Sequence, residues 1–138
     1  MLLTTHSRCT LPSSFLIGLH PSFGVEGIHG RSEHDFARST GTIPLLLLPA
    51  GNDSLKPGNA TVKILADART MPETELSVEF PAMLHGWVVR GDPNMEDVRR
   101  EQERALKLTV KFIETHHPAG VDRLFLVTCI VVAGRTNG

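Results

Sequence analysis

Hydrophobic residues gather in short runs along the chain, without the alternation of a half-exposed strand. The segments Phe15–Leu19 (FLIGL) and Ile43–Leu48 (IPLLLL) are apolar almost throughout. A strand that is covered on both faces, as in the middle of a parallel sheet, has this composition. Pro44 and Pro49 bracket the second run and disfavour a helix there. We therefore predict buried strands at both runs and a further strand at Leu76–Phe80 (LSVEF).

Two longer stretches have helical periodicity instead. Asn59 is suited to cap a helix that continues to about Arg69. A second helix is predicted over residues 95–117, with Asp92 or Asn94 at its start. Its apolar face comprises Val98, Ala105, Thr109 and Phe112, with Leu108 and Ile113 beside them.

The remaining segments are a connection and an apolar end. Residues 21–42 are rich in Gly, Ser and His and predict an irregular connection with one helical turn around Glu33 to Arg38. Leu124–Gly134 (LFLVTCIVVAG) allows a final strand. Helices that alternate with buried strands predict an α/β fold with a mainly parallel sheet flanked by helices.

Composition narrows the classes of partner. The 138 residues are 41% hydrophobic and carry a formal net charge of −1, whereas nucleic-acid binders usually carry a basic face. The apolar run Leu124–Gly134 is shorter than the roughly 20 residues that span a bilayer. Pro12 and two serines interrupt the amino-terminal run, which argues against a signal peptide. We expect no nucleic-acid or membrane partner.

Cysteine and histidine spacing gives no sign of a metal centre. Cys9 and Cys129 lie near opposite ends, which fits neither a disulfide framework nor a zinc site and favours a cytoplasmic location. The other candidate ligands match no known ligand spacing and predict neither metal nor cofactor; they are His6, His20, His29, His34 and the pair His116 and His117.

Two titratable residues follow predicted strands. Asp53 comes five residues after Leu48, and His85 comes five residues after Phe80. Neighbouring parallel strands would bring both to one edge of the sheet, where catalytic groups gather in such folds. A carboxylate that binds an imidazole orients it as a general base, and Gly86 lets the backbone bend behind the ring. Taken alone, Asp53 has a simpler interpretation as a turn former, and His85 has one as a solvated loop histidine.

Three segments in register resemble a known family. IPLLLLPAGNDSLKPG, then SVEFPAMLHGWVVRGD, then the long helix are similar to the dienelactone hydrolases (carboxymethylenebutenolidases) of the α/β-hydrolase superfamily, and GLHPSF is similar to the family's preceding strand. The resemblance covers residues 14–117, while residues 1–13 and 118–138 do not match. It implies part of an α/β-hydrolase fold.

The resemblance also implies an activity. Asp53 would be the acid and His85 the base of a Cys/Ser-Asp-His triad that hydrolyses a small lactone or carboxylic ester. Trp87 would line the substrate pocket, and Arg90 would bind a substrate carboxylate. For Arg90 a solvated surface position is an equal alternative, because exposed arginines are common.

The sequence lacks the nucleophile motif that the dienelactone hydrolase family requires. The chain contains no Gly-x-Cys/Ser-x-Gly elbow, and Cys9 lies too close to Phe15 for the helical crossover that parallel strands need. Ser14 and Ser22 fail for the same reasons, and Cys129 follows the last helix. We therefore expect a carboxyl-terminal portion of a hydrolase that is inactive alone. The alternative is a non-catalytic binding or dimerisation module that self-associates through an exposed sheet edge, which Leu124–Gly134 could also seal.

Overall fold

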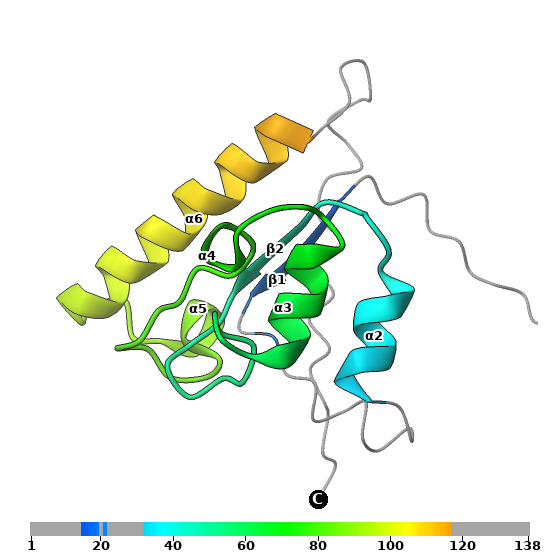
Figure 1. The fold of residues 1–138 in the computed structure, drawn as a ribbon. Coiled ribbons are helices and arrows are strands. Elements are labelled where there is room, and N and C mark those ends of the chain that lie inside the picture. Colours follow the sequence, from blue (N-terminus) through cyan, green and yellow to red (C-terminus); the bar gives the residue numbers. More distant parts are fainter. Residues whose placement is uncertain (1–14, 20, 22–31, 117–138) are drawn as a thin grey trace, which may run out of the picture.

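The structure, a computed structural model, describes residues 15–19, 21 and 32–116 (Figure 1). The predicted final strand at Leu124–Gly134, both cysteines and the serines at positions 14 and 22 lie outside these ranges. The elements, in chain order, are β1 (Leu16–Leu19), α2 (Glu33–Ser39), β2 (Leu45–Leu48), α3 (Ala60–Asp67), α4 (Glu73–Leu76), α5 (Trp87–Arg90) and α6 (Glu96–His116).

The first two predicted strands form a parallel pair. Leu16 lies opposite Leu45, and Leu19 lies opposite Leu48. All four side chains of β2 are buried, as the unbroken apolar run predicts for a central strand. Pro44 precedes the strand, and its carbonyl accepts the N–H of Leu16 at 2.8 Å.

The predicted third strand is reduced to two isolated parallel bridges, which join Leu47 to Ser77 and Ala50 to Phe80. The N–H groups of Val78 and Phe80 donate to backbone carbonyls of the β2 segment, each at 2.9 Å. Pro49 has no N–H to donate in return, which interrupts the ladder. The first residue of the predicted strand, Leu76, closes the short helix α4 instead.

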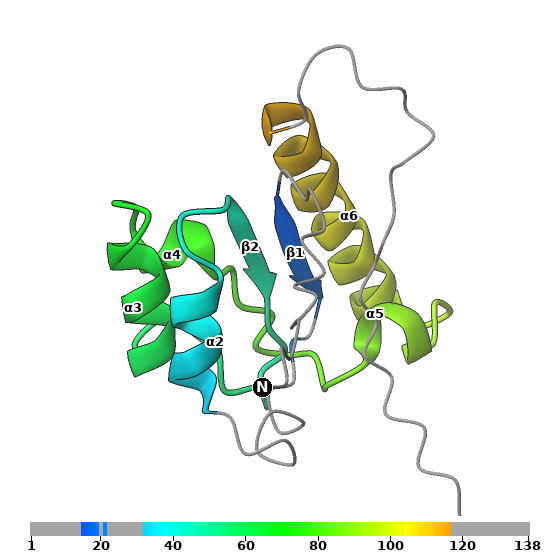
Figure 2. The same cartoon turned by 90° about the vertical axis from the view of Figure 1, so that its right-hand side faces the viewer.

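Helices cover both faces of this small sheet. On one face, residues of α2 and α3 pack on Leu45 and Leu47; on the other, residues of α6 pack with Leu46, Leu48 and Phe80. Successive strand residues point to opposite faces, so one short strand contributes to two cores. Figure 2 shows α2 and α3 on one side of the strands and α6 on the other. The fold is therefore α/β, with helices on both sides of parallel strands.

Local capping explains where the helices begin. The Asn59 side chain accepts the N–H groups of Thr61 at 2.7 Å and Val62 at 3.4 Å, as predicted, and α3 ends at Asp67, slightly before Arg69. The predicted turn near residue 33 is the helix α2. There the backbone N–H of Ser32, and then its hydroxyl, donate to Asp35 and lower the pKa of that carboxyl below its ordinary value.

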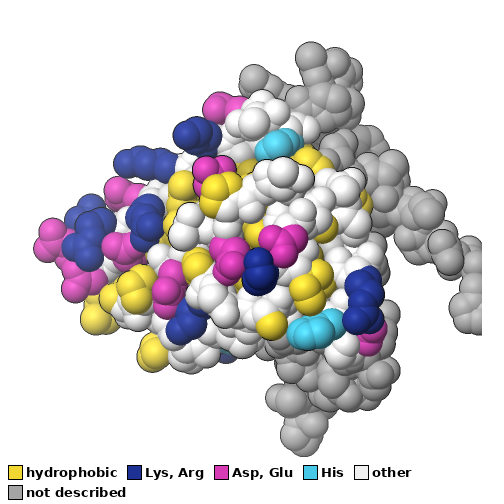
Figure 3. Space-filling view, in the orientation of Figure 1, with side chains coloured by type: hydrophobic (Ala, Val, Ile, Leu, Met, Phe, Trp, Pro, Cys, Tyr) yellow, Lys and Arg dark blue, Asp and Glu magenta, His cyan; other side chains and the backbone are white. Residues whose placement is uncertain are grey.

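The surface carries intermixed charges. Acidic and basic side chains are interspersed along α6, where Arg100 contacts Asp97 at 2.8 Å and Arg104 contacts Glu101 at 3.2 Å (Figure 3). Among the described residues, no helix combines the length and the apolar character needed to cross a bilayer.

Candidate active site

The Asp53 carboxylate and the His85 imidazole are in direct contact. Asp53 Oδ1 lies 2.6 Å from His85 Nδ1. The two residues follow adjacent parallel segments, which brings them to the carboxyl-terminal edge of the sheet. The Asp53 side chain is 5% exposed and the His85 side chain is 35% exposed, so a buried acid supports an accessible ring.

The turn that contains Asp53 fixes its carboxylate. Oδ2 accepts the N–H of Ala50 at 2.7 Å, while the N–H of Asp53 donates to the Ala50 carbonyl at 3.1 Å. The second oxygen is thereby turned toward His85. A carboxylate only accepts hydrogen bonds, so the hydrogen between the two groups belongs to Nδ1. In the neutral ring Nε2 is then the basic nitrogen, which is the tautomer that a general base requires.

Backbone contacts hold the two loops together. The Asn52 side chain accepts the N–H of His85 at 2.7 Å, and the N–H of Gly51 donates to the Met83 carbonyl at 2.9 Å. A Cβ atom at Gly51 would collide with the Pro81 carbonyl, so only glycine allows this approach. Asn52 was not predicted from the sequence as part of the site. The signal was an amide side chain beside Asp53 in the same turn.

Gly86 provides the bend behind the histidine. Its φ of 87° is in the left-handed region, and it is the N-cap residue immediately before α5. The N–H of Arg90 donates to the Gly86 carbonyl at 2.9 Å, and the Arg90 guanidinium lies over the Gly86 Cα, where a side chain would otherwise project. The fold thus places the guanidinium beside the residue that follows His85.

Replacing Gly86 by alanine is expected to lower the free energy of unfolding by about 1–2 kcal/mol, because an L side chain is strained in the left-handed region. The new methyl group would also displace the Arg90 guanidinium. Chemical denaturation measures the loss. Gly86→Asn is the matched control and should cost less, since asparagine tolerates this conformation. Equal stability of Gly86→Ala and the parent chain would contradict the left-handed conformation of Gly86.

Trp87 lies in the core beneath the site. Its ring packs on Phe80, with centroids 4.7 Å apart, and is nearly fully buried. The amide of Gln102 donates to the carbonyls of Trp87 and Val88, each at 3.2 Å, and ties α5 to α6. The indole N–H has no acceptor among the residues described. The contact with a substrate that was expected for Trp87 stays a prediction.

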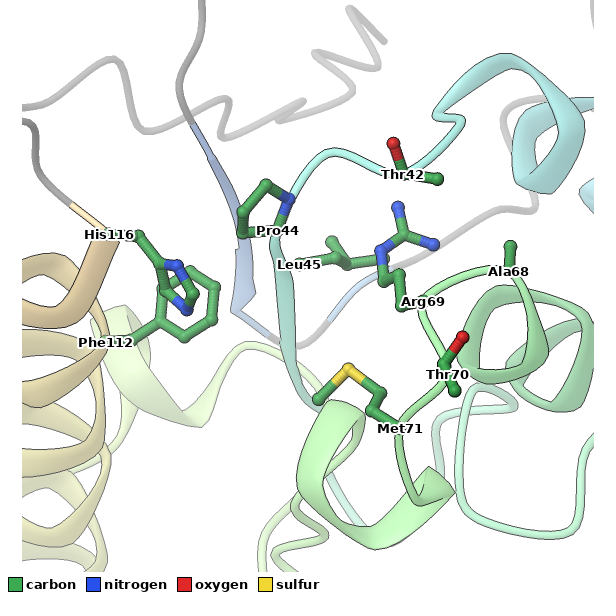
Figure 4. Close-up of a pocket in the computed structure, with 9 residues that line it drawn as sticks. All are labelled: Thr42, Pro44, Leu45, Ala68, Arg69, Thr70, Met71, Phe112 and His116. Atoms are coloured by element: carbon green, nitrogen blue, oxygen red, sulfur yellow. The ribbon is translucent and has the colours of Figure 1, made fainter.

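A hollow lies on another part of the molecule. A cavity of about 400 Å³ is found at the amino-terminal end of β2, between Arg69 and the end of α6 (Figure 4). Three guanidinium nitrogens of Arg69 donate to the carbonyls of Ile43 and Leu65 and to the Thr40 hydroxyl. Partial burial lowers the pKa of Arg69 from its ordinary value. Neither Asp53 nor His85 lines this cavity, so it is separate from the candidate active site.

Within the described ranges, no group of three or more His, Cys, Asp or Glu side chains is arranged to hold a metal ion. Comparisons of the chain with protein-family models, with curated protein sequences and with solved structures gave no match.

Proposed function

We propose that the chain carries the acid and the base of a dienelactone hydrolase-like triad, which hydrolyses a small lactone or carboxylic ester. The observation that supports this most is the 2.6 Å contact between a buried, doubly anchored Asp53 and a partly exposed His85. Structural Asp–His contacts also occur, but this one lies where parallel α/β folds place their catalytic groups.

The arrangement of the elements is consistent with an α/β-hydrolase. The acid follows one parallel segment and the histidine follows the next, in the chain order that this superfamily uses after its nucleophile. Helices cover both faces of the sheet, and a long helix follows the histidine. We infer a partial α/β-hydrolase fold over residues 15–116.

The chemistry of the pair is general acid–base catalysis. His85 Nε2 would accept the proton of a Cys or Ser nucleophile as that atom attacks the ester carbonyl. Asp53 would stabilise the imidazolium that results. The imidazolium then donates its proton to the leaving alkoxide. In the second half of the reaction, His85 would deprotonate the water that attacks the acyl-enzyme and would return that proton to the nucleophile as the acyl bond breaks. In this proposed reaction, Asp53 would orient the ring and His85 would carry the proton.

Residues around His85 suit an acidic substrate with an apolar body. The Arg90 guanidinium beside Gly86 offers a bidentate partner for a carboxylate. Leu84 and Val89, on either side of His85 in the chain, are 72% and 61% exposed. These side chains would provide an apolar wall next to the catalytic base.

The sequence holds no nucleophile elbow, so the chain alone should hydrolyse 4-nitrophenyl acetate no faster than its His85→Ala variant. The sharper test is a chimera in which the amino-terminal half of a dienelactone hydrolase, with its elbow, precedes residues 15–116. The folded chimera should hydrolyse the ester, and His85→Ala should lower kcat by at least about 10³-fold.

The exposed His34, which contacts Thr61 at 3.2 Å, supplies the matched control. His34→Ala should leave the rate of the chimera nearly unchanged. A cooperatively folded chimera whose rate is insensitive to His85→Ala would refute the triad. If the chain alone hydrolysed the ester at a rate that falls in His85→Ala, the chain would contain a nucleophile outside the elbow pattern.

A non-catalytic binding or dimerisation module is the second candidate. It is favoured by the outer edge of β1, which has no partner strand among the described residues. Size-exclusion chromatography with light scattering separates the two ideas. A molar mass that rises from that of a monomer to that of a dimer as the protein concentration is raised would support self-association. A folded monomer at all concentrations would count against it.

A further inference from the structure

The cavity at the amino-terminal end of β2 combines basic groups with an apolar lining. Its volume of about 400 Å³ lies within the range of small-molecule sites. The apolar side chains that line it are those of Pro44, Leu45, Ala68, Met71 and Phe112. The polar ones are Arg69, His116, Thr42 and Thr70. The described residues of the lining thus provide basic and hydroxyl groups and no carboxylate, which suits a ligand with an apolar body and a negative charge.

Neutral acceptors hold the Arg69 guanidinium in place. Nε donates to the Ile43 carbonyl and Nη1 to the Leu65 carbonyl, each at 2.8 Å, while Nη2 donates to the Thr40 hydroxyl at 3.3 Å. A guanidinium has five N–H groups, so these bonds leave one N–H on each terminal nitrogen. Partial burial lowers the pKa of Arg69, and no carboxylate of the described residues opposes that shift. The positive charge is therefore fixed in position but is not neutralised by these contacts.

The backbone beside Arg69 is also fixed. The N–H of Met71 donates to the Ala66 carbonyl and that of Thr70 to the Asp67 carbonyl, each at 3.2 Å, which is the pattern of a Schellman motif at the end of α3. Thr70 has a φ of 53°, in the left-handed region that glycine usually occupies at this position. A β-branched residue is strained there. This wall is held in one conformation, so little ordering would oppose the binding of a ligand.

The opposite wall of the cavity comes from α6. Figure 4 shows Phe112 and His116 on one side and Arg69 and Met71 on the other, with Pro44 between them. The rings of Phe112 and His116 have centroids 4.4 Å apart. Aromatic rings and thioethers both form favourable contacts with flat apolar groups. The imidazole adds at least one N–H donor beside this apolar surface.

We propose that this cavity binds a small monocarboxylate with a flat apolar body, its carboxylate on Arg69 and its body between Met71 and Phe112. The two remaining guanidinium N–H groups can each bond one carboxylate oxygen. The cavity lies at the amino-terminal end of β2, whereas Asp53 and His85 follow the carboxyl-terminal ends of their segments. The inference therefore does not depend on the proposed hydrolase activity.

Titration of the isotope-labelled full chain with sodium phenylacetate, followed by NMR, tests the proposal. We expect saturable shifts of the Arg69 Nε–H and of the amides of residues 69–71 and 112–116, with a Kd on the order of 1 mM. Phenylacetamide is the neutral analogue of the same shape. It should bind at least about tenfold more weakly, because it forms no charge-assisted hydrogen bond with the guanidinium. This comparison uses the parent chain and needs no variant that could disturb the fold.

A pair of arginine variants tests the contact directly. Arg69→Met should weaken the binding of phenylacetate at least about tenfold and leave that of phenylacetamide nearly unchanged. Arg38→Met is the matched control and should leave both affinities unchanged, since Arg38 is an exposed residue of α2 that contacts Asp35.

Four results would overturn the proposal. The first is the absence of saturable binding, and the second is equal affinity of the parent chain for phenylacetate and phenylacetamide. The third is a set of shifts confined to residues 84–90, which would place the carboxylate at Arg90. The fourth is tighter binding of inorganic phosphate than of phenylacetate, because the apolar lining would then contribute nothing.

Discussion

Replacing Phe80 by alanine is expected to lower the free energy of unfolding by about 3–5 kcal/mol, the usual loss for a large aromatic residue in a core. Phe80 is 1% exposed and contacts the Trp87 ring. The Arg104 guanidinium lies 4.5 Å from the centroid of the Phe80 ring. The backbone of Phe80 also forms the last bridge to the β2 segment, at Ala50. Urea denaturation followed by circular dichroism measures the change.

Leu84→Ala is the matched control, four residues along the same loop. Leu84 is 72% exposed, and its truncation should change the stability by no more than about 0.5 kcal/mol. A loss below about 1 kcal/mol for Phe80→Ala would mean that α6 and the sheet do not share the core described above.

Asp53→Asn should invert the tautomer of the neutral His85 ring. The asparagine carbonyl can still accept the Ala50 N–H, which places the amide group toward Nδ1. An amide donates where the carboxylate accepted, so the ring hydrogen should move to Nε2. Nitrogen chemical shifts of the imidazole report this change directly. In the active chimera the same variant should lower kcat by about 10⁴-fold.

Asn52→Ala provides the contrasting variant at the neighbouring position. It removes the acceptor of the His85 backbone N–H and should lower stability by about 1 kcal/mol, but the Asp53–His85 contact and the tautomer should persist. If Asp53→Asn left the hydrogen on Nδ1, the carboxylate would not be the group that orients the ring.

The parts of the fold that could be predicted from sequence are those with a strong local cause. The unbroken apolar run at β2 and the capping side chain of Asn59 each indicated an element that the structure contains. The short helices α4 and α5 were not predicted, because four residues carry too little periodicity. The strand predicted at residues 76–80 is longer than the two isolated bridges that the structure contains. Pro49 has no N–H to donate to the segment beside it, and a single sequence does not specify which segment that is.

The candidate site shows a similar division. The contact between Asp53 and His85 followed from one rule, that successive parallel strands end at the same edge. The support from Asn52 and the position of the Arg90 guanidinium over Gly86 depend on loop conformation, which a single sequence does not specify. The predicted side chains thus meet, whereas the contacts that hold them in place required the structure.

The cross-bonded loops also have an evolutionary consequence. Asp53 lies three residues after Ala50, and His85 lies five residues after the bridged Phe80. Because the loops are joined at Gly51, Asn52 and Asp53, an insertion in one of them would shift all of these contacts at once. Sequences that descend from this chain should therefore conserve the lengths of both loops, or, once the contacts are lost, vary in the lengths of both. Length variation should accumulate elsewhere, such as in the exposed residues 92–95 that precede α6.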